Sequence, residues 1–174
     1  MRVLVGVDDS PHSQAAVEFV KKMIWPEGTR VVVLAAVRPL VGAYLETYVP
    51  GPDYAVRIEE EQMQYVQGIA ARAERGLRSA GLGTEARTVR GDPREALIET
   101  ARAERSDLVV VGSHGRSGLS KLFIGSVASH VVTHAPCSVL VVKPAAGASE
   151  TAGRESLKAR KPGTTSKEEP HSWG

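Results

Sequence analysis

The stretch that decides the fold covers residues 107–135 and reads "DLVVVGSHGRSGLSKLFIGSVASHVVTHA". Its branched apolar start predicts a buried strand at 107–111, and the apolar spacing near its end predicts a helix at about 125–133. The connection from Gly112 to Ser126 contains four glycines and four serines. A long connection of this kind inside a compact domain is often functional. A candidate site is therefore expected at the carboxyl end of this strand.

The rest of the chain before residue 144 repeats this alternation of strand and helix. Ser10 is expected to cap a helix that starts at Pro11 and continues through Met23 and Ile24 on its apolar side. Asp92 is expected to cap another helix, with Glu95 completing a capping box. The other predicted strands are 3–7, 29–37, 84–90 and 138–142, and the other predicted helix is 56–80.

The order of these elements predicts an α/β fold. Strands and helices alternate as β-α-β-α-β-α-β-α-β, and the strands are continuous apolar runs except 84–90, which alternates weakly. This pattern indicates a single doubly wound domain with a five-stranded parallel sheet and helices on both faces. Residues 38–54, which contain Tyr44, Tyr48 and Tyr54, are expected to form a long loop. Residues 144–174 have almost no large apolar side chains and are predicted to be a disordered C-terminal tail.

Composition excludes several classes of protein. The formal net charge is +2, which is too small to indicate a nucleic-acid surface. No apolar run reaches the roughly 18 residues of a membrane span, and the N-terminus does not read as a signal peptide. The single cysteine, Cys137, excludes an intramolecular disulfide. We therefore expect a soluble, cytoplasmic protein without a nucleic-acid or membrane partner.

Two loops are candidates for a ligand site, because ligands of open parallel sheets bind beyond the carboxyl ends of the strands. The loop after the first strand, "GVDDSPHS", lacks a dinucleotide fingerprint and carries two acids. Asp8 is the candidate here for accepting hydrogen bonds from a ribose or an adenine amino group. Asp9 is interpreted as a solvated loop acid.

The second loop, the glycine segment, suits a phosphate group. Glycines with positive φ allow successive N–H groups to converge on an anion. Gly125 and Ser126 open a helix whose first N–H groups lack internal partners and carry partial positive charge. Arg116 and Lys121 add positive charge between them.

These residues also carry a resemblance to a known family. Gly112-x2-Gly115-x9-Gly125-Ser126 is similar to the G-x2-G-x9-G-[ST] pattern of the ATP-binding universal stress proteins. "VGVDDSPHSQAAV" and "GDPREALIETA" resemble two further signatures of that family, and the likeness covers residues 1–143. The resemblance implies an ATP-binding regulatory protein of the stress response, whose nucleotide occupancy modulates its conformation or its binding of partners.

The resemblance implies a set of binding residues and a sheet order. A divalent cation, Mg²⁺ or Mn²⁺, could accompany the ATP, without a clear protein ligand set. The sheet order would be 3-2-1-4-5, and a homodimer would form through the fifth strand, Ser138 to Val142. The implied nucleotide-binding residues are Gly6, Val7, Asp8, Val37, Val111, Gly112, Gly115, Arg116, Gly125, Ser126 and Val127.

Alternatives to ATP binding stay open at this point. A nucleotide-free member of the family would act as a protein-interaction module, and a slow ATPase would need a placed base, which the sequence does not show. No catalytic residues are assigned. His130 and His134 have the helical spacing of a zinc pair, but no third ligand lies nearby in the sequence, so ordinary helix positions are expected.

Overall fold

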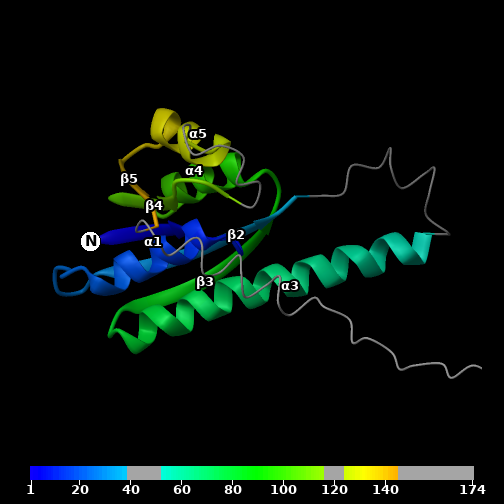
Figure 1. Ribbon diagram of the computed structural model, residues 1–174, viewed down its shortest axis with the longest axis horizontal. Coiled ribbons are helices and arrows are strands. Elements are labelled where there is room, and N and C mark those ends of the chain that lie inside the picture. The colour runs from blue at the N-terminus through cyan, green and yellow to red at the C-terminus, as the bar shows by residue number, and fades with distance from the viewer. Residues whose placement is uncertain (39–51, 116–123, 145–174) are drawn as a thin grey trace, which may run out of the picture. The chain divides into compact units, whose positions relative to one another are not determined.

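The computed structural model describes residues 1–38, 52–115 and 124–144. Its centre is a five-stranded sheet in the order β3-β2-β1-β4-β5, in which every neighbouring pair is parallel (Figure 1). This confirms the predicted fold and the strand order that the family resemblance implies. The strands are β1 (Arg2–Gly6), β2 (Arg30–Val37), β3 (Gly83–Arg90), β4 (Leu108–Gly112) and β5 (Ser138–Val142).

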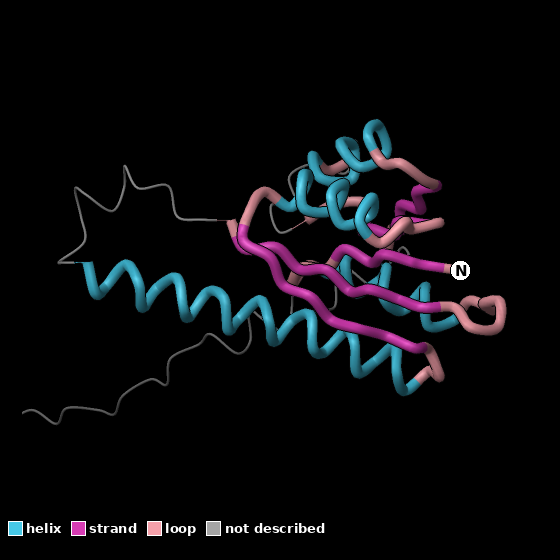
Figure 2. The backbone as a smooth tube through the Cα atoms, turned by 180° about the vertical axis from the view of Figure 1, so that it is seen from behind, coloured by secondary structure: helices cyan, strands magenta, loops and turns pink. Residues whose placement is uncertain are grey.

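Helices cover both faces of the sheet, as the apolar character of the strands predicts (Figure 2). The helices are α1 (Pro11–Lys22), α3 (Pro52–Ser79), α4 (Pro93–Ala103) and α5 (Ser126–His134). One core lies under α1 and α3 and contains Val5, Val33 and Leu77; the other lies under α4 and α5 and contains Leu4 and Val109. Alternate residues of each buried strand therefore pack into the cores on opposite faces of the sheet.

Two predicted boundaries are wrong. Helix α1 ends at Lys22, and the Met23 and Ile24 side chains, expected on its apolar face, are 38% and 98% exposed. Helix α3 begins at Pro52, so the end of the predicted loop 38–54 is helical. Proline favours the first turn of a helix, where its missing N–H needs no partner. Residues 39–51 of that loop, with Tyr44 and Tyr48, and the predicted tail beyond Pro144 lie outside the described residues.

The N-cap of α4 is confirmed, but its capping box is wrong. The Asp92 carboxylate accepts a hydrogen bond from the backbone N–H of Arg94 at 2.8 Å. Glu95 instead lies 3.2 Å from the His130 ring on α5. The Glu95 side chain therefore links two helices rather than closing the first turn of its own.

Two substitutions of Asp92 are expected to separate the contribution of its helix cap to stability from the contribution of its negative charge. The Arg94 guanidinium, which donates two hydrogen bonds to the carboxylate, lowers the pKa of Asp92 to about 2 despite partial burial. Asp92→Ala should lower the free energy of unfolding by about 1 kcal/mol, whereas Asp92→Asn, which retains a capping oxygen, should lose less. Because folding lowers this pKa, the charge of Asp92 adds to the free energy of unfolding above about pH 4. This contribution disappears as the pH falls towards 2. Urea unfolding of both variants between pH 2 and 7 tests this, and a wild-type advantage over Asp92→Asn that stays constant down to pH 2 would contradict it.

Candidate functional site

The candidate site lies at the point where the chain reverses the direction in which it adds strands to the sheet. The chain moves from β1 outwards through β2 to β3 and then returns to β4 on the other side of β1. The loops that leave β1 and β4 therefore diverge to opposite faces, and ligands of open parallel sheets bind between the starting points of two such loops. Both loops predicted to bind ligand begin at this point.

Hydrogen bonds fix the loop after β1. Asp8 Oδ1 accepts from the backbone N–H of Ser10 at 3.0 Å and from its hydroxyl at 2.5 Å. Ser13 Oγ accepts from the N–H of Asp8 at 3.0 Å, and Ser10 Oγ caps α1 by accepting from the N–H of Ser13 at 3.1 Å. Both serines are buried. The Asp8 carboxylate is thus held in one orientation by the first turn of α1.

Asp9 is not the solvated acid that was expected. Its side chain is half-buried, and its Oδ2 accepts a hydrogen bond from the Tyr65 hydroxyl of α3 at 2.7 Å. This bond ties the loop after β1 to α3, across 56 positions of sequence. Nothing in the local sequence indicates this partner.

The described ends of the loop after β4 come together at the start of α5. The Gly125 N–H donates to the Ser113 carbonyl at 2.8 Å, and the Ser113 N–H donates to the carbonyl of Val142 in β5 at 2.8 Å. Gly125 is the N-cap of α5 and supplies no side-chain cap, whereas Ser10 and Asp92 cap α1 and α4. Among the described residues, no N-cap side chain therefore satisfies the first N–H groups of α5, which are suited to an anion.

The loops after β1 and β4 contact each other through Gly115. A Cβ atom on Gly115 would lie 3.1 Å from Asp8 Oδ2. The Ser10 hydroxyl lies 3.4 Å from the His114 carbonyl, which joins the same two loops. The structure therefore brings Asp8, Gly115 and Gly125 into one small region, as the family resemblance implies.

The conformation of the glycines differs from the prediction. Among the described glycines, positive φ occurs only at Gly28, Gly81 and Gly91, so Gly112, Gly115 and Gly125 do not use it. Close approach is the reason for glycine at two of these positions. A Cβ on Gly112 would lie 2.6 Å from the carbonyl carbon of His12, and one on Gly125 would lie 3.1 Å from the Cα of His114.

The other predicted site residues are mostly part of the core. A Cβ on Gly6 would lie 2.9 Å from a Leu97 methyl group, so β1 packs closely under α4 there. Val37 ends β2, and its carbonyl accepts a hydrogen bond from the Gly91 N–H at 2.9 Å. Ser126 is exposed at the start of α5. Val7, Val37 and Val111 are buried, and Val127 packs against the core under α4 and α5. Arg116 and Lys121 lie outside the described residues.

The sequence did not indicate that His12 belongs to the candidate site. The Nδ1 atom of His12 lies 2.9 Å from Ser113 Oγ, and that oxygen lies 3.2 Å from Nδ1 of His114. The two imidazole rings are 4.8 Å apart at their centroids and tilted by 54°. Burial and the neighbouring His114 lower the pKa of His12, and Asp8 opposes them in part. The sequence showed two unrelated histidines, 102 positions apart, in the two loops.

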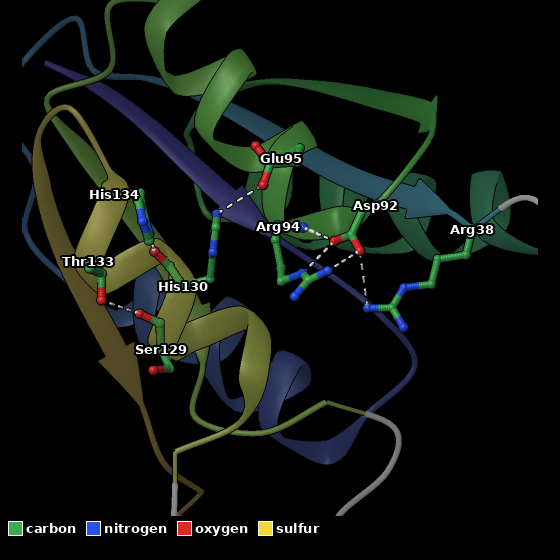
Figure 3. Close-up of polar contacts among 8 residues, drawn as sticks. All are labelled: Arg38, Asp92, Arg94, Glu95, Ser129, His130, Thr133 and His134. Carbon is green, nitrogen blue, oxygen red and sulfur yellow. Dashed lines mark hydrogen bonds and ion pairs between the residues drawn. The ribbon is translucent and has the colours of Figure 1, made fainter.

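A second polar cluster lies beside α4 and α5 (Figure 3). Arg38, directly after β2, lies 3.9 Å from Asp92, which also pairs with Arg94. His130 faces Glu95, and its ring stacks on that of His134 with centroids 4.2 Å apart. No group of three potential metal-binding side chains occurs in residues 1–38, 52–115 and 124–144.

Comparison with known proteins decides the family. The model of the universal stress protein family matches residues 1–143. The chain belongs to the universal stress protein family. This universal stress protein is 30% identical to one from Thermus aquaticus, in the QAH/OAS sulfhydrylase 3' region, over 142 residues that cover 81% of this chain and 97% of the relative.

Solved structures share the fold of this universal stress protein. Hypothetical protein MJ0577 superposes with a TM-score of 0.72 at 21% identity, covering 84% of this chain and 97% of that chain. A universal stress protein in complex with cAMP superposes with a TM-score of 0.59 at 27% identity, covering 82% and 96%. Within the part of the chain that the structure describes, we find no helix with the length and apolar character needed to cross a membrane.

Proposed function

We propose that this universal stress protein binds ATP between the carboxyl ends of β1 and β4. Nucleotide occupancy would then modulate its conformation or its binding of partners in the stress response. The observation that carries the proposal is the meeting of the Asp8 carboxylate, through Gly115, with the start of α5, which has no side-chain cap. In the part of the chain that the structure describes, a polar acceptor for a nucleoside and N–H donors without a side-chain cap thus lie side by side.

The two ends of the nucleotide would meet different groups. Phosphate oxygens would accept hydrogen bonds from the N–H groups of Gly115, Ser126 and Val127, since no side chain caps α5. The adenosine would meet Asp8 and the end of β2 at Val37. Arg116, which the family pattern places beside the phosphates, lies outside the described residues. The cAMP complex of a relative at 27% identity supports an adenine nucleotide as the class of ligand.

A divalent cation fits this site only as a companion of the phosphates. Asp8 and Asp9 are oxygen ligands of the kind that Mg²⁺ and Mn²⁺ prefer. However, Asp8 Oδ1 accepts from Ser10, Asp9 Oδ2 accepts from Tyr65, and the described residues contain no group of three ligands. Phosphate oxygens would therefore supply most of the coordination, and the cation would reduce the charge of the polyphosphate.

Direct identification of the ligand tests the proposal. Protein purified without added nucleotide is denatured, and the released small molecules are identified by mass spectrometry. Calorimetric titration of nucleotide-free protein with ATP, AMP and adenosine then gives the contribution of the phosphates. We expect ATP to be released and to bind more tightly than adenosine. Protein that binds none of the three would contradict the proposal and favour a nucleotide-free interaction module, and steady release of phosphate from ATP would show a slow ATPase.

Asp8→Asn is expected to weaken the recognition of adenosine specifically. The amide oxygen can still accept from Ser10, so the loop should keep its shape, but the group that faces the ligand loses its charge and gains a donor. The affinity for ATP should fall by about 1–2 kcal/mol, a factor of about 5–30, while the affinity for inorganic triphosphate should not fall. Asp107→Asn, just before the amino end of β4, is the matched control. Equal losses for ATP and triphosphate would exclude this role for Asp8.

We also propose that the chain forms a homodimer through β5. This strand is at the edge of the sheet, and its central residues, Val139 to Val141, are half-buried without a strand beyond them among the described elements. An apolar edge strand is a template for pairing with a second chain. Sedimentation equilibrium measures the mass directly, and a monomer at all concentrations would exclude the dimer.

A further inference from the structure

Two histidines share one buried hydroxyl group at the point where the loops after β1 and β4 meet. Ser113 is fully buried, and its Oγ lies within hydrogen-bond distance of Nδ1 of both His12 and His114. Both rings are half-buried. His12 belongs to the first turn of α1, and His114 lies against Gly125, the N-cap of α5. The three residues therefore lie at the ligand-facing ends of two helices.

The hydrogen bonds between Ser113 and the two imidazole rings limit how many protons the rings can hold. A hydroxyl has one proton to donate, so in the neutral pair one Nδ1–H donates to Ser113 Oγ, and Oγ–H donates to the other Nδ1. One added proton leaves this chain of hydrogen bonds intact, because the charged ring still donates from Nδ1. A second added proton turns both Nδ1 atoms into donors, and the buried hydroxyl proton loses its imidazole acceptor. The two rings thus act as a unit in which a second proton costs more than the first.

The surroundings of His12 favour its neutral form before a ligand binds. Burial and His114 lower the pKa of His12, and Asp8 is the carboxylate that raises it. The first turns of α1 and α5 contain no acidic residue. A phosphate group at the start of α5 would add negative charge beside the rings and would raise their affinity for a proton.

We propose that His12 and His114, joined through Ser113, form the position for a phosphate group of the nucleotide and take up one proton when it binds. This inference rests on the proposed function, because it assigns residues and a charge state to the same site. It follows that the affinity for nucleotides falls as the pH rises above neutrality, by up to about tenfold per pH unit for one linked proton. Adenosine, which has no phosphate, should bind with no such dependence.

Proton counting by calorimetry tests the inference. ATP is titrated into the full chain at pH 7 in two buffers of different ionisation enthalpy, and the difference in heat gives the number of protons taken up. The same titration is done with His12→Gln, His114→Gln and His134→Gln. The last is the matched control, since His134 is exposed near the far end of α5 and its ring bonds to the His130 carbonyl. Protons that belong to ATP itself contribute equally in all four proteins.

We expect wild type and His134→Gln to take up more protons than either site variant, by more than half a proton per ATP, and adenosine to cause no uptake. Equal proton counts in wild type, His12→Gln and His114→Gln, with ATP still bound, would overturn the inference and leave the proposed function intact. Uptake by wild type on binding adenosine would also overturn it. If no form of the protein binds ATP, the proposed function itself fails. A melting curve for each variant verifies that it is folded, and the comparison of ATP with adenosine in wild type needs no variant.

Discussion

Gly112→Ala is expected to lower the free energy of unfolding by about 2–3 kcal/mol, although it adds only one methyl group. The added Cβ would lie 2.6 Å from the carbonyl carbon of His12 and 2.8 Å from both its oxygen and the Ser13 nitrogen. All three are backbone atoms of the first turn of α1, so no side chain can rotate away. The helix must shift from the end of β4, and the shift disturbs the contact of Ser113 with His12. Urea denaturation of the variant and the wild type measures the loss.

Gly68→Ala is the control for this substitution. Gly68 is inside α3, and a Cβ there would meet only the end of the flexible Arg72 side chain, at 3.7 Å. Alanine is a better helix former than glycine, so this variant should gain about 0.5–1 kcal/mol of stability. Changes of opposite sign in the free energy of unfolding of the two Gly→Ala variants would show that contact with the backbone decides the effect. Wild-type stability in Gly112→Ala would contradict the close approach of α1 to β4.

Gly115→Val is expected to reduce the affinity for ATP by at least about a hundredfold, which corresponds to about 2.7 kcal/mol. Its Cβ would lie 3.1 Å from Asp8 Oδ2, and the branched methyl groups would extend from there into the region that we assign to the nucleotide. The nearest atom is a side-chain oxygen and not a backbone atom, and 3.1 Å requires only a small adjustment, so the fold should be retained. Isothermal titration with ATP and a melting curve measure the two effects separately. Undiminished ATP affinity in a folded variant would contradict the assignment of this region.

Gly83→Val is the matched control at the opposite edge of the sheet. Gly83 is exposed at the start of β3, and a Cβ there would lie 3.8 Å from the Thr29 carbonyl, an ordinary contact. Valine is well suited to a strand, so neither stability nor ATP affinity should fall. A loss of affinity in both variants would indicate that the effect of valine at residue 115 is not local.

The local elements could be predicted where short-range chemistry determines them. Ser10 and Asp92 cap their helices as expected, because a cap depends only on the few residues that follow it. The end of α1 was placed too late, since Met23 and Ile24 continue the apolar spacing of the helix although they are exposed. The pattern records which residues are apolar, but their burial depends on which segments pack over them.

By itself, the sequence determined the parallel α/β sheet, the alternation of its helices and the two loops that carry the candidate site. These follow from strand and helix periodicity and from the rule that binding loops leave the carboxyl ends of the strands. Only the tertiary structure decided which residues of these loops meet: Tyr65 with Asp9, Glu95 with His130, and His12 with His114 through Ser113. Pairs of this kind join positions far apart in the chain, and no local pattern encodes them, because the packing of helices on the sheet sets the distance between their side chains.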